Sequence, residues 1–417
     1  MSDHHRTEHR RAHTIAETTI ALYSHDSVGL GHARRNRALA HALDRHLPAL
    51  TGGPVRGMLV AGHPDAGRDP LPEGWDWLIL PGLTRGREGW TPRSLGMDPA
   101  ALRDLRSGVI AAALETLDPD LLVVDRHPFG IDGELLPVLE TLRGRGCRTV
   151  LGLREVLDTP RVAVAEWESL GGAARVASLL DAVWVYGDQR VYDPRRTGEL
   201  PGPLARLAEP TGYLSRGRPA ARIARTPRAS PAPPPPYVLT VLGGGSDGAE
   251  LARLAVAART PHGCRHLLVT GPQMPAGALE ELRDLADETT AVVRTAPDVP
   301  ELIAGAAAVV CMGGYNTIAE LLDTDTPALV VPRSRRRQEQ PRRAEALAAV
   351  GALETRRIED LTPEDITAWW ARAVGTSTER TGLDLDGLEA VPHLAAALLE
   401  RPARPLPILP EVHSHAV

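Results

Sequence analysis

The sequence predicts an α/β protein of two doubly wound, Rossmann-like domains that face each other across a cleft. Short β-branched or apolar runs alternate with longer amphipathic stretches, which is the pattern of a parallel sheet covered by helices on both faces. A proline-rich stretch interrupts this alternation, which then restarts. The chain has 417 residues, and single cores rarely grow beyond about 250 to 300 residues. Together these observations favour two domains over one.

Composition excludes several classes of protein. Hydrophobic residues at 43% and charged residues at 24% are ordinary for a globular chain. The formal net charge of −6 argues against a nucleic-acid partner, because phosphate backbones are usually met by a basic excess. Cys147, Cys264 and Cys311 lie in apolar surroundings and predict buried free thiols in a reducing, cytoplasmic environment.

The sequence predicts no membrane span and no secretory signal. No apolar run approaches the roughly 20 residues that cross a bilayer. Residues 1–17 are rich in His and Arg and lack an apolar core, so they predict a disordered tail. A second tail is expected at 401–417.

The first domain is expected over residues 18–215. Its segment Thr84–Met97 is rich in Gly, Arg and Trp without a clear period, and predicts a surface loop near the ligand. The predicted strands are Thr19–Tyr23, Met58–Ala61, Trp77–Leu80, Leu121–Val124, Thr149–Leu153 and Val183–Tyr186, and the predicted helices are Ala33–His46, Ala100–Leu117 and Gly133–Arg143.

A linker is expected over residues 216–236, where Arg, Ala and Pro dominate and the run of four prolines from Pro233 to Pro236 favours an extended spacer. The second domain then covers 237–400. Its predicted strands are Tyr237–Leu242, His266–Thr270, Ala291–Arg294, Ala307–Cys311 and Ala328–Val331, and its predicted helices are Ala249–Ala258, Ala276–Ala286, Pro300–Gly305, Arg342–Val350, Pro363–Val374 and Pro392–Leu399.

The most informative loop for function lies in the second domain, between a buried strand and a short helix. Gly313 and Gly314 follow a buried strand and allow a sharp turn into a short helix that ends near Leu322. Asn316 and Thr317 then lie at a helix N-terminus, where free N–H groups and the helix dipole favour an anion. One turn further, Glu320 is placed to accept hydrogen bonds from two hydroxyls. This spacing suits a nucleotide diphosphate, with the phosphates at the mouth and the ribose deeper.

The loop after the first strand carries the candidate catalytic group. Gly29 and Gly31 allow close backbone approach, and His32 opens the following helix. An imidazole titrates near neutral pH, so it can take a proton from a hydroxyl or from water. A histidine that only caps the helix is the alternative. The Asp125-Arg126-His127 stretch follows another strand, and there Asp125 and His127 are candidates to orient His32 or to bind substrate.

Two further loops are candidate ligand contacts. Gly243 to Gly248 match Gly-x-Gly-x-x-Gly, but the next strand ends in Val269-Thr270-Gly271-Pro272 without the carboxylate that a dinucleotide ribose needs. Without a dinucleotide site, the hypothesis for this loop is that its free N–H groups contact a phosphate or a hydroxyl group. A plain tight turn is the alternative. After the strand ending at Val331, an arginine-rich stretch leads to Glu339 and Gln340, which can bond sugar hydroxyls. The arginines are either a solvated face or the neutralising partners of a diphosphate or an acidic acceptor.

A metal site is not expected. Asp323-Thr324-Asp325 has the spacing of a metal–diphosphate motif but lies in a helix-to-strand connection, at the sheet edge away from the ligand loops. Zinc, Walker and nucleophile-elbow motifs are absent from the sequence.

These loops resemble those of the MurG-like glycosyltransferases of family 28, which have the GT-B fold. The carriers of the resemblance are Gly244 to Ala249, Gly313 to Glu320, Pro332 to Gln340 and, in the first domain, Gly29 to His32. The residue after the second glycine of the donor helix is bulky here, Tyr315, and the arginine cluster is unusual for the family. Both departures leave the sugar and the acceptor open.

The resemblance implies a metal-independent hexosyl- or N-acetylhexosaminyltransferase without a cofactor, whose co-substrate is a nucleotide-diphosphate sugar, usually a UDP-sugar. His32 would act on the acceptor hydroxyl, and Gly29, Gly31, Arg34, Asp125, His127 and Arg333 would line the acceptor or phosphate side. The acceptor stays open between a small molecule and a lipid, and so does peripheral membrane contact. The expected donor residues are Gly244, Gly245, Ser246, Gly313, Gly314, Asn316, Thr317, Glu320, Glu339 and Gln340.

Other functional interpretations of the same loops stay open. The stretch Gly29 to Arg34 is also similar to a loop of UDP-sugar hydrolases, in which water replaces the acceptor. UDP-GlcNAc 2-epimerases are a third relative. From a different class, the chain would be a non-catalytic nucleotide- or sugar-binding partner of another enzyme.

Overall fold

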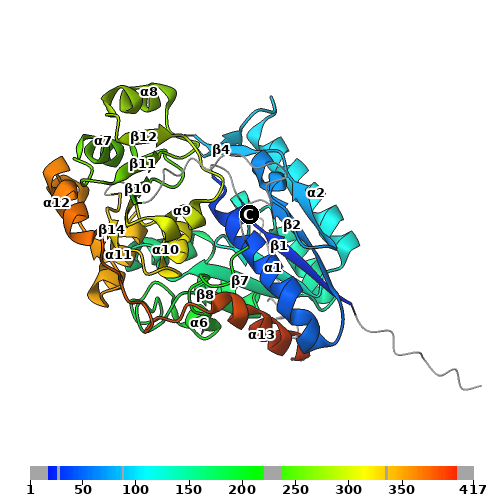
Figure 1. The fold of residues 1–417 in the computed structure, drawn as a ribbon. Coiled ribbons are helices and arrows are strands. Elements are labelled where there is room, and N and C mark those ends of the chain that lie inside the picture. The colour runs from blue at the N-terminus through cyan, green and yellow to red at the C-terminus, as the bar shows by residue number, and fades with distance from the viewer. Residues whose placement is uncertain (1–16, 26–28, 87–88, 220–235, 334–336, 402–417) are drawn as a thin grey trace, which may run out of the picture.

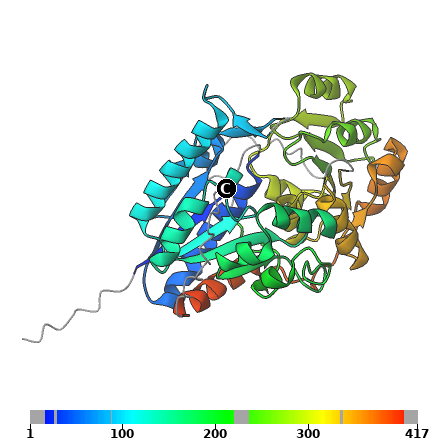
Figure 2. The ribbon, with the colours of Figure 1, turned by 180° about the vertical axis from the view of Figure 1, so that it is seen from behind.

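The computed structural model describes residues 17–25, 29–86, 89–219, 236–333 and 337–401. Two parallel sheets, each covered by helices on both faces, form two units that lie side by side (Figure 1). The same arrangement is seen from behind in Figure 2. The α/β class and the two Rossmann-like units predicted from the sequence are therefore confirmed.

The first sheet has seven parallel strands in the order β3-β2-β1-β6-β7-β8-β9. Its central strands are buried along their whole length, as expected of strands that helices cover on both faces. The strands are β1 (Thr18–Tyr23), β2 (Val55–Ala61), β3 (Trp75–Ile79), β6 (Leu121–Asp125), β7 (Arg148–Arg154), β8 (Ala182–Tyr186) and β9 (Ala208–Pro210).

The helices of the first unit follow these strands. The longest, α1, begins at Gly31 directly after the candidate catalytic loop. The helices are α1 (Gly31–Thr51), α2 (Pro99–Leu117), α3 (Leu136–Gly144), α4 (Pro160–Ser169), α5 (Ala173–Ser178) and α6 (Gly202–Ala205), with short 3-10 turns at Pro64–Arg68 and Ile131–Gly133.

The second sheet has six parallel strands in the order β12-β11-β10-β13-β14-β15. The strands are β10 (Tyr237–Val241), β11 (Arg265–Val269), β12 (Thr290–Val293), β13 (Ala308–Cys311), β14 (Ala328–Val330) and β15 (Glu354–Thr355). The helices are α7 (Ala249–Ala257), α8 (Ala276–Leu285), α9 (Val299–Gly305), α10 (Tyr315–Leu322), α11 (Glu339–Ala349), α12 (Pro363–Ala373) and α13 (Gly387–Glu400), with a 3-10 turn at Ile358–Asp360.

The two units are closely connected. The last helix, α13, returns to the first unit and packs along α1, where the red and blue helices lie side by side in Figure 1. One cluster of buried apolar side chains runs from α1 and β8 through Tyr213 and Tyr315 into α10 and α13. The rings of Tyr213 and Tyr315 stack with centroids 6.4 Å apart. The sheets are therefore joined by packed core as well as by the chain.

Most predicted elements are present, with ends that differ by a few residues. The prediction for Thr84–Met97 was wrong in part: its described residues lie at the surface, but they include part of an antiparallel hairpin of β4 (Leu83–Arg85) and β5 (Trp90–Pro92). Its strands are only three residues long, too short for an alternating pattern to show. The short elements α4, α5, α6, β9 and β15 were not predicted.

Several expectations fall partly or wholly outside the described residues. They are the N-terminal and C-terminal tails, most of the linker, and the middle of the arginine stretch after Val331. The domain boundaries remain predictions. The three cysteines are buried and free, as expected.

Candidate active site

The ligand loops of the two units meet at the carboxyl ends of the two sheets. The Nδ2 of Asn316, in the first turn of α10, donates a hydrogen bond of 2.8 Å to the carbonyl of Gly31, where α1 begins. Nearby, the side chain of Gln273 lies between Gly29 of the first unit and Gly244 of the second, 3.1 to 3.2 Å from where a Cβ would stand on either glycine. The loops therefore form one site at the boundary between the units.

His32 lies in the first turn of α1, next to a buried carboxylate. Its Nδ1 is 3.3 Å from Oδ2 of Asp125, which ends β6 and is fully buried. The guanidinium of Arg35, one turn along α1, donates to both oxygens of Asp125 at 2.9 and 2.6 Å and also lies 3.0 Å from His32 Nδ1. With its proton on Nδ1, His32 donates to Asp125 and leaves Nε2 able to accept a proton. The other tautomer would take a hydrogen bond from Arg35 instead and would carry its proton on Nε2.

The groups around His32 have shifted pKa values that set their charge. Burial alone would raise the pKa of Asp125, but Arg35 and His32 hold it well below its usual range. His25 and His127 stack edge-on, with ring centroids 4.3 Å apart, and His25 makes the same contact with His32. Burial and the neighbouring cationic groups lower the pKa of both His25 and His127, so both rings are neutral at pH 7. His32 thus adjoins the ionised carboxylate of Asp125 and the neutral ring of His25.

Helix α10 presents an open N-terminus to the same space. Gly313 has φ = 77°, and a Cβ there would lie 2.7 Å from Val330, so this turn requires glycine. Gly314 precedes the helix without a capping side chain, and the first intrahelical bond is Ile318 N–H to Gly314 O at 2.9 Å. The N–H groups of residues 315–317 therefore lack helical partners and suit an anion. The predicted short helix ending near Leu322 is confirmed.

Glu320 is buried one turn into α10, with 5% of its surface exposed. Arg34 of α1 donates to Oε1 at 2.5 Å, and Arg218 lies 3.5 Å from the same oxygen. The other oxygen, Oε2, is buried and has no hydrogen-bond partner within the described residues. A carboxylate with one free buried oxygen is suited to accept hydroxyl groups from a ligand.

The remaining predicted donor residues lie around the loops of the second sheet. Gly245 has φ = 87°, and a Cβ there would lie 2.2 Å from the Thr270 carbonyl, while Gly244 and Ser246 are exposed before α7. Gln340 Oε1 accepts from the Arg333 N–H at 3.2 Å. Glu339 begins α11 and pairs with Arg333 at 2.9 Å and with Arg154, at the end of β7, at 2.8 Å. The predicted site residues thus lie around one boundary, and several already contact arginines.

The charge of Glu339 depends on those arginines. Burial would raise its pKa, but Arg154, Arg343, Arg333 and Arg337 lower it to about 2. Because the pKa is depressed in the folded state, the carboxylate stabilises the protein fully above its ordinary pKa of 4.5, and this contribution is lost as the pH falls toward 2.

We therefore expect Glu339→Gln to lower the thermal midpoint most at pH 6 to 7, and the deficit to shrink as the pH falls through about 4 to 3. Thermal denaturation of both proteins across this range measures the difference. The exposed variant Glu301→Gln, on α9, is the control. A deficit that stays constant with pH would contradict the role of the carboxylate charge.

The sequence did not reveal several residues at the boundary. Arg35 is hidden inside a helix, and Gln273 lies in an unremarkable loop. Arg154 ends β7, and this place at the carboxyl end of a parallel strand is the signal that could have identified it. Arg218 lies in the stretch predicted only as a linker, yet it reaches α10. Tyr315 was noted only for its size; the guanidinium groups of Arg35 and Arg343 lie over its ring, 5.5 and 5.6 Å from the centroid.

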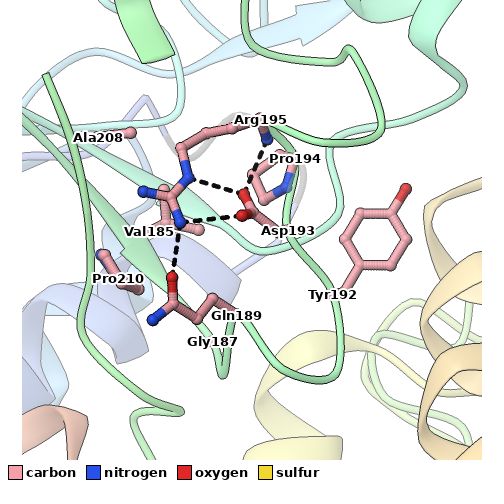
Figure 3. A pocket seen from close by; sticks show the side chains of 9 residues that line it. All are labelled: Val185, Gly187, Gln189, Tyr192, Asp193, Pro194, Arg195, Ala208 and Pro210. Atoms are coloured by element: carbon pink, nitrogen blue, oxygen red, sulfur yellow. Dashed lines mark hydrogen bonds and ion pairs between the residues drawn. The ribbon is translucent and has the colours of Figure 1, made fainter. Parts of the chain in front are cut away.

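Two cavities lie away from these loops. The smaller, of about 10 Å³, lies beside the loop 187–195, where Arg195 pairs with Asp193 and Gln189 (Figure 3); it has room for a water molecule only. The larger, of about 450 Å³, is lined by Arg216, Asp323 to Asp325 and the segment 377–381, at the C-terminal end of α10. Asp323 to Asp325 connect α10 to β14, as predicted, and lie at the opposite end of that helix from the ligand loops.

Two kinds of feature are absent from the residues that the structure describes. These residues contain no group of three or more acidic, His or Cys side chains arranged to hold a metal ion. Among these residues, no helix is long and apolar enough to cross a bilayer.

Comparisons with known proteins agree with this architecture. Residues 238–374 match the family model described as the glycosyltransferase family 28 C-terminal domain. No curated protein sequence matches the chain significantly.

Solved structures resemble the chain over nearly its whole length. They include the calicheamicin glycosyltransferase CalG4 (17% identity, 93% of this chain and 99% of that chain, TM-score 0.56). A UDP-glucosyltransferase from Polygonum tinctorium (15%, 93% and 100%, 0.56) and MurG from Acinetobacter baumannii (13%, 92% and 99%, 0.51) are also similar. At these identities the likeness concerns the fold, while the family model identifies the second domain. Residues 238–374 therefore form a glycosyltransferase family 28 C-terminal domain, and the two units together have the GT-B fold.

Proposed function

We propose that the chain transfers a hexosyl or N-acetylhexosaminyl group from a nucleotide-diphosphate sugar, a UDP-sugar, to a hydroxyl acceptor without a metal ion. The observation that carries this proposal is the junction of the two loops. Asn316 of α10 contacts Gly31 at 2.8 Å, and the His32–Asp125 pair adjoins that contact. A base and an anion-binding helix N-terminus therefore share one site.

The donor is assigned to the second unit. Its diphosphate would rest on the free N–H groups at the start of α10, beside Asn316 and Thr317. Its ribose would bond Glu320, whose Oε2 is free and buried. Its sugar would lie toward Glu339 and Gln340 at the start of α11. The uncapped N-terminus of α7, behind Gly244 to Ser246, adds further N–H groups.

The acceptor is assigned to the side of His32. The acceptor hydroxyl would give its proton to Nε2 of His32 while its oxygen bonds the anomeric carbon of the sugar. The bond from that carbon to the diphosphate breaks, and the leaving oxygen keeps the electron pair. Asp125 would hold the His32 ring and stabilise the imidazolium. Helix N-termini and arginine side chains would stabilise the charge that develops on the diphosphate.

The test is turnover with defined donors. The purified protein is incubated with UDP-glucose or UDP-N-acetylglucosamine, with and without a panel of hydroxyl acceptors, and both UDP release and glycosylated product are measured. We expect product only when an acceptor is present. Equal UDP release without acceptor would identify a hydrolase instead, and nucleotide binding without any turnover would identify a binding protein.

A second expectation concerns Glu320. Replacing it with Gln removes a charged acceptor, which we expect to weaken UDP binding by about 10- to 100-fold. Calorimetry with UDP and with 2′,3′-dideoxy-UDP measures this. If Glu320 bonds the ribose hydroxyls, the unmodified protein should bind the dideoxy analogue more weakly than UDP by this same factor. The change from Glu320 to Gln should then weaken binding of the analogue little further. If Glu320→Gln weakens the binding of UDP and of the dideoxy analogue by the same factor, the ribose contact is contradicted. Glu301→Gln is the control.

A further inference from the structure

The carboxylate assigned to the ribose is already held by two arginines that come from outside the second unit. Arg34 belongs to α1, and Arg218 lies just after the first unit, at the start of the connecting segment. Both approach Oε1 of Glu320, at 2.5 and 3.5 Å. Neither residue is part of α10, so their meeting point is created by the fold.

Arg218 is fixed at this place by three groups. Besides Glu320, these are the Leu214 carbonyl, which accepts from Nε at 2.5 Å, and Asn316 Oδ1, which accepts from Nη2 at 3.1 Å. Its side chain is only 11% exposed, whereas that of Arg34 is 38% exposed. Burial lowers the pKa of Arg218, and a guanidinium group keeps its charge at neutral pH. A buried guanidinium thus lies beside the helix N-terminus that would bind the diphosphate.

The ion pairing of Glu320 with the two arginines is incomplete. Arg218 shares one oxygen of Glu320 with Arg34, while Oε2 of Glu320 is buried and has no partner within the described residues. Two cations on one carboxylate leave an excess of positive charge at the start of α10. A diphosphate brings the negative charge that would balance it, and guanidinium groups bind phosphate in bidentate fashion.

We propose that Arg218 and Arg34 form a diphosphate subsite that exchanges partners when the donor binds. In the empty protein both arginines are paired with Glu320. The diphosphate takes over the guanidinium groups, and this releases Glu320 Oε1 to join Oε2 in bonding the two ribose hydroxyls. The inference rests on the proposed function, because it concerns the same donor.

The exchange has a consequence that a purely structural ion pair lacks. A nucleoside without phosphates must break the arginine contacts of Glu320 without offering a replacement, so it binds poorly. The diphosphate supplies the replacement, and the affinity therefore rises steeply from nucleoside to nucleoside diphosphate. Arg218 should therefore strengthen the binding of the nucleoside diphosphate and weaken the binding of the nucleoside.

The test compares uridine, UMP and UDP in calorimetric titrations of the unmodified protein and Arg218→Gln. We expect UDP affinity to fall about 10- to 100-fold in the variant, while uridine binds as tightly as before or more tightly. The matched control is Arg216→Gln, two residues away, because Arg216 is half exposed and pairs with Asp386 at 3.1 Å. Inorganic pyrophosphate is the second probe and should lose affinity in Arg218→Gln only.

The outcomes separate the two proposals. A thermal-shift screen with UDP, GDP and TDP comes first, and the series is run with the nucleotide that stabilises the protein. Stabilisation by none of the three would overturn the proposed function and this inference with it. If nucleotides bind but Arg218→Gln weakens uridine and UDP by the same factor, or neither, then the exchange is wrong and the proposed function stands.

Discussion

Replacing His32 with Ala is expected to lower kcat about 100- to 10,000-fold, the range that a positioned general base contributes. His32 is the ring that adjoins both Asp125, at 3.3 Å from its Nδ1, and the contact between Gly31 and Asn316. Because His32 is not among the residues assigned to the donor, UDP affinity should change little. The rate falls, and binding remains.

The measurement is steady-state turnover together with calorimetry of UDP. His46→Ala is the matched control, because it lies on the same helix, about 21 Å further along its axis. A His32→Ala variant that keeps more than about a tenth of kcat would remove His32 from the chemistry. Loss of UDP affinity together with kcat would instead indicate that the residue shapes the donor site.

The sequence predicted the elements of this site better than their contacts. Gly31, His32 and the α10 loop were found because turn residues at the ends of apolar strands are a local signal, and parallel strands bring such ends to one edge. The position of Asp125 after a strand also raised it as a partner of His32. The structure places them 3.3 Å apart, while the catalytic role stays a prediction.

The arginines at the boundary could not be found in this way. Arg35, Arg218 and Arg343 carry no local signal, because an arginine in a helix or a linker is usually solvated. Their function in the fold depends on which carboxylate the other unit brings near, and that is a tertiary property. The hairpin of β4 and β5 was missed for a related reason, since a strand of three residues is fixed by its partner and not by its own pattern.

Tyr315 shows how the boundary explains a departure from the family pattern. Its hydroxyl accepts from the Leu214 N–H at 3.1 Å, and the guanidinium groups of Arg35 and Arg343 both lie over its ring. Each guanidinium pairs with a buried carboxylate of the first unit, Asp125 or Glu155. The bulky residue thus fills the junction between the His32 pair and the donor helix, a position where a small residue would leave a gap.

The Glu155–Arg343 pair is expected to dominate the stability of this boundary. Glu155 follows β7 and Arg343 lies on α11, and each side chain is only 1% exposed. Two hydrogen bonds of 2.7 and 3.1 Å join them, and Arg343 Nη1 also reaches the Gly313 carbonyl at 3.4 Å. Removing one partner leaves a buried charge without a counterion, which typically costs about 3 to 5 kcal/mol.

We therefore expect Glu155→Gln to lower the free energy of unfolding by about 3 to 5 kcal/mol in urea denaturation. The double variant Glu155→Leu with Arg343→Met removes both charges and should recover most of that loss, because apolar replacements of a buried pair are often neutral. Glu281→Gln is the control, since Glu281 makes a similar two-bond pair with Arg253 at the surface, of 2.7 and 2.8 Å, and exposed pairs contribute little. A double variant less stable than Glu155→Gln would show that the boundary depends on the charges themselves and not on their mutual compensation.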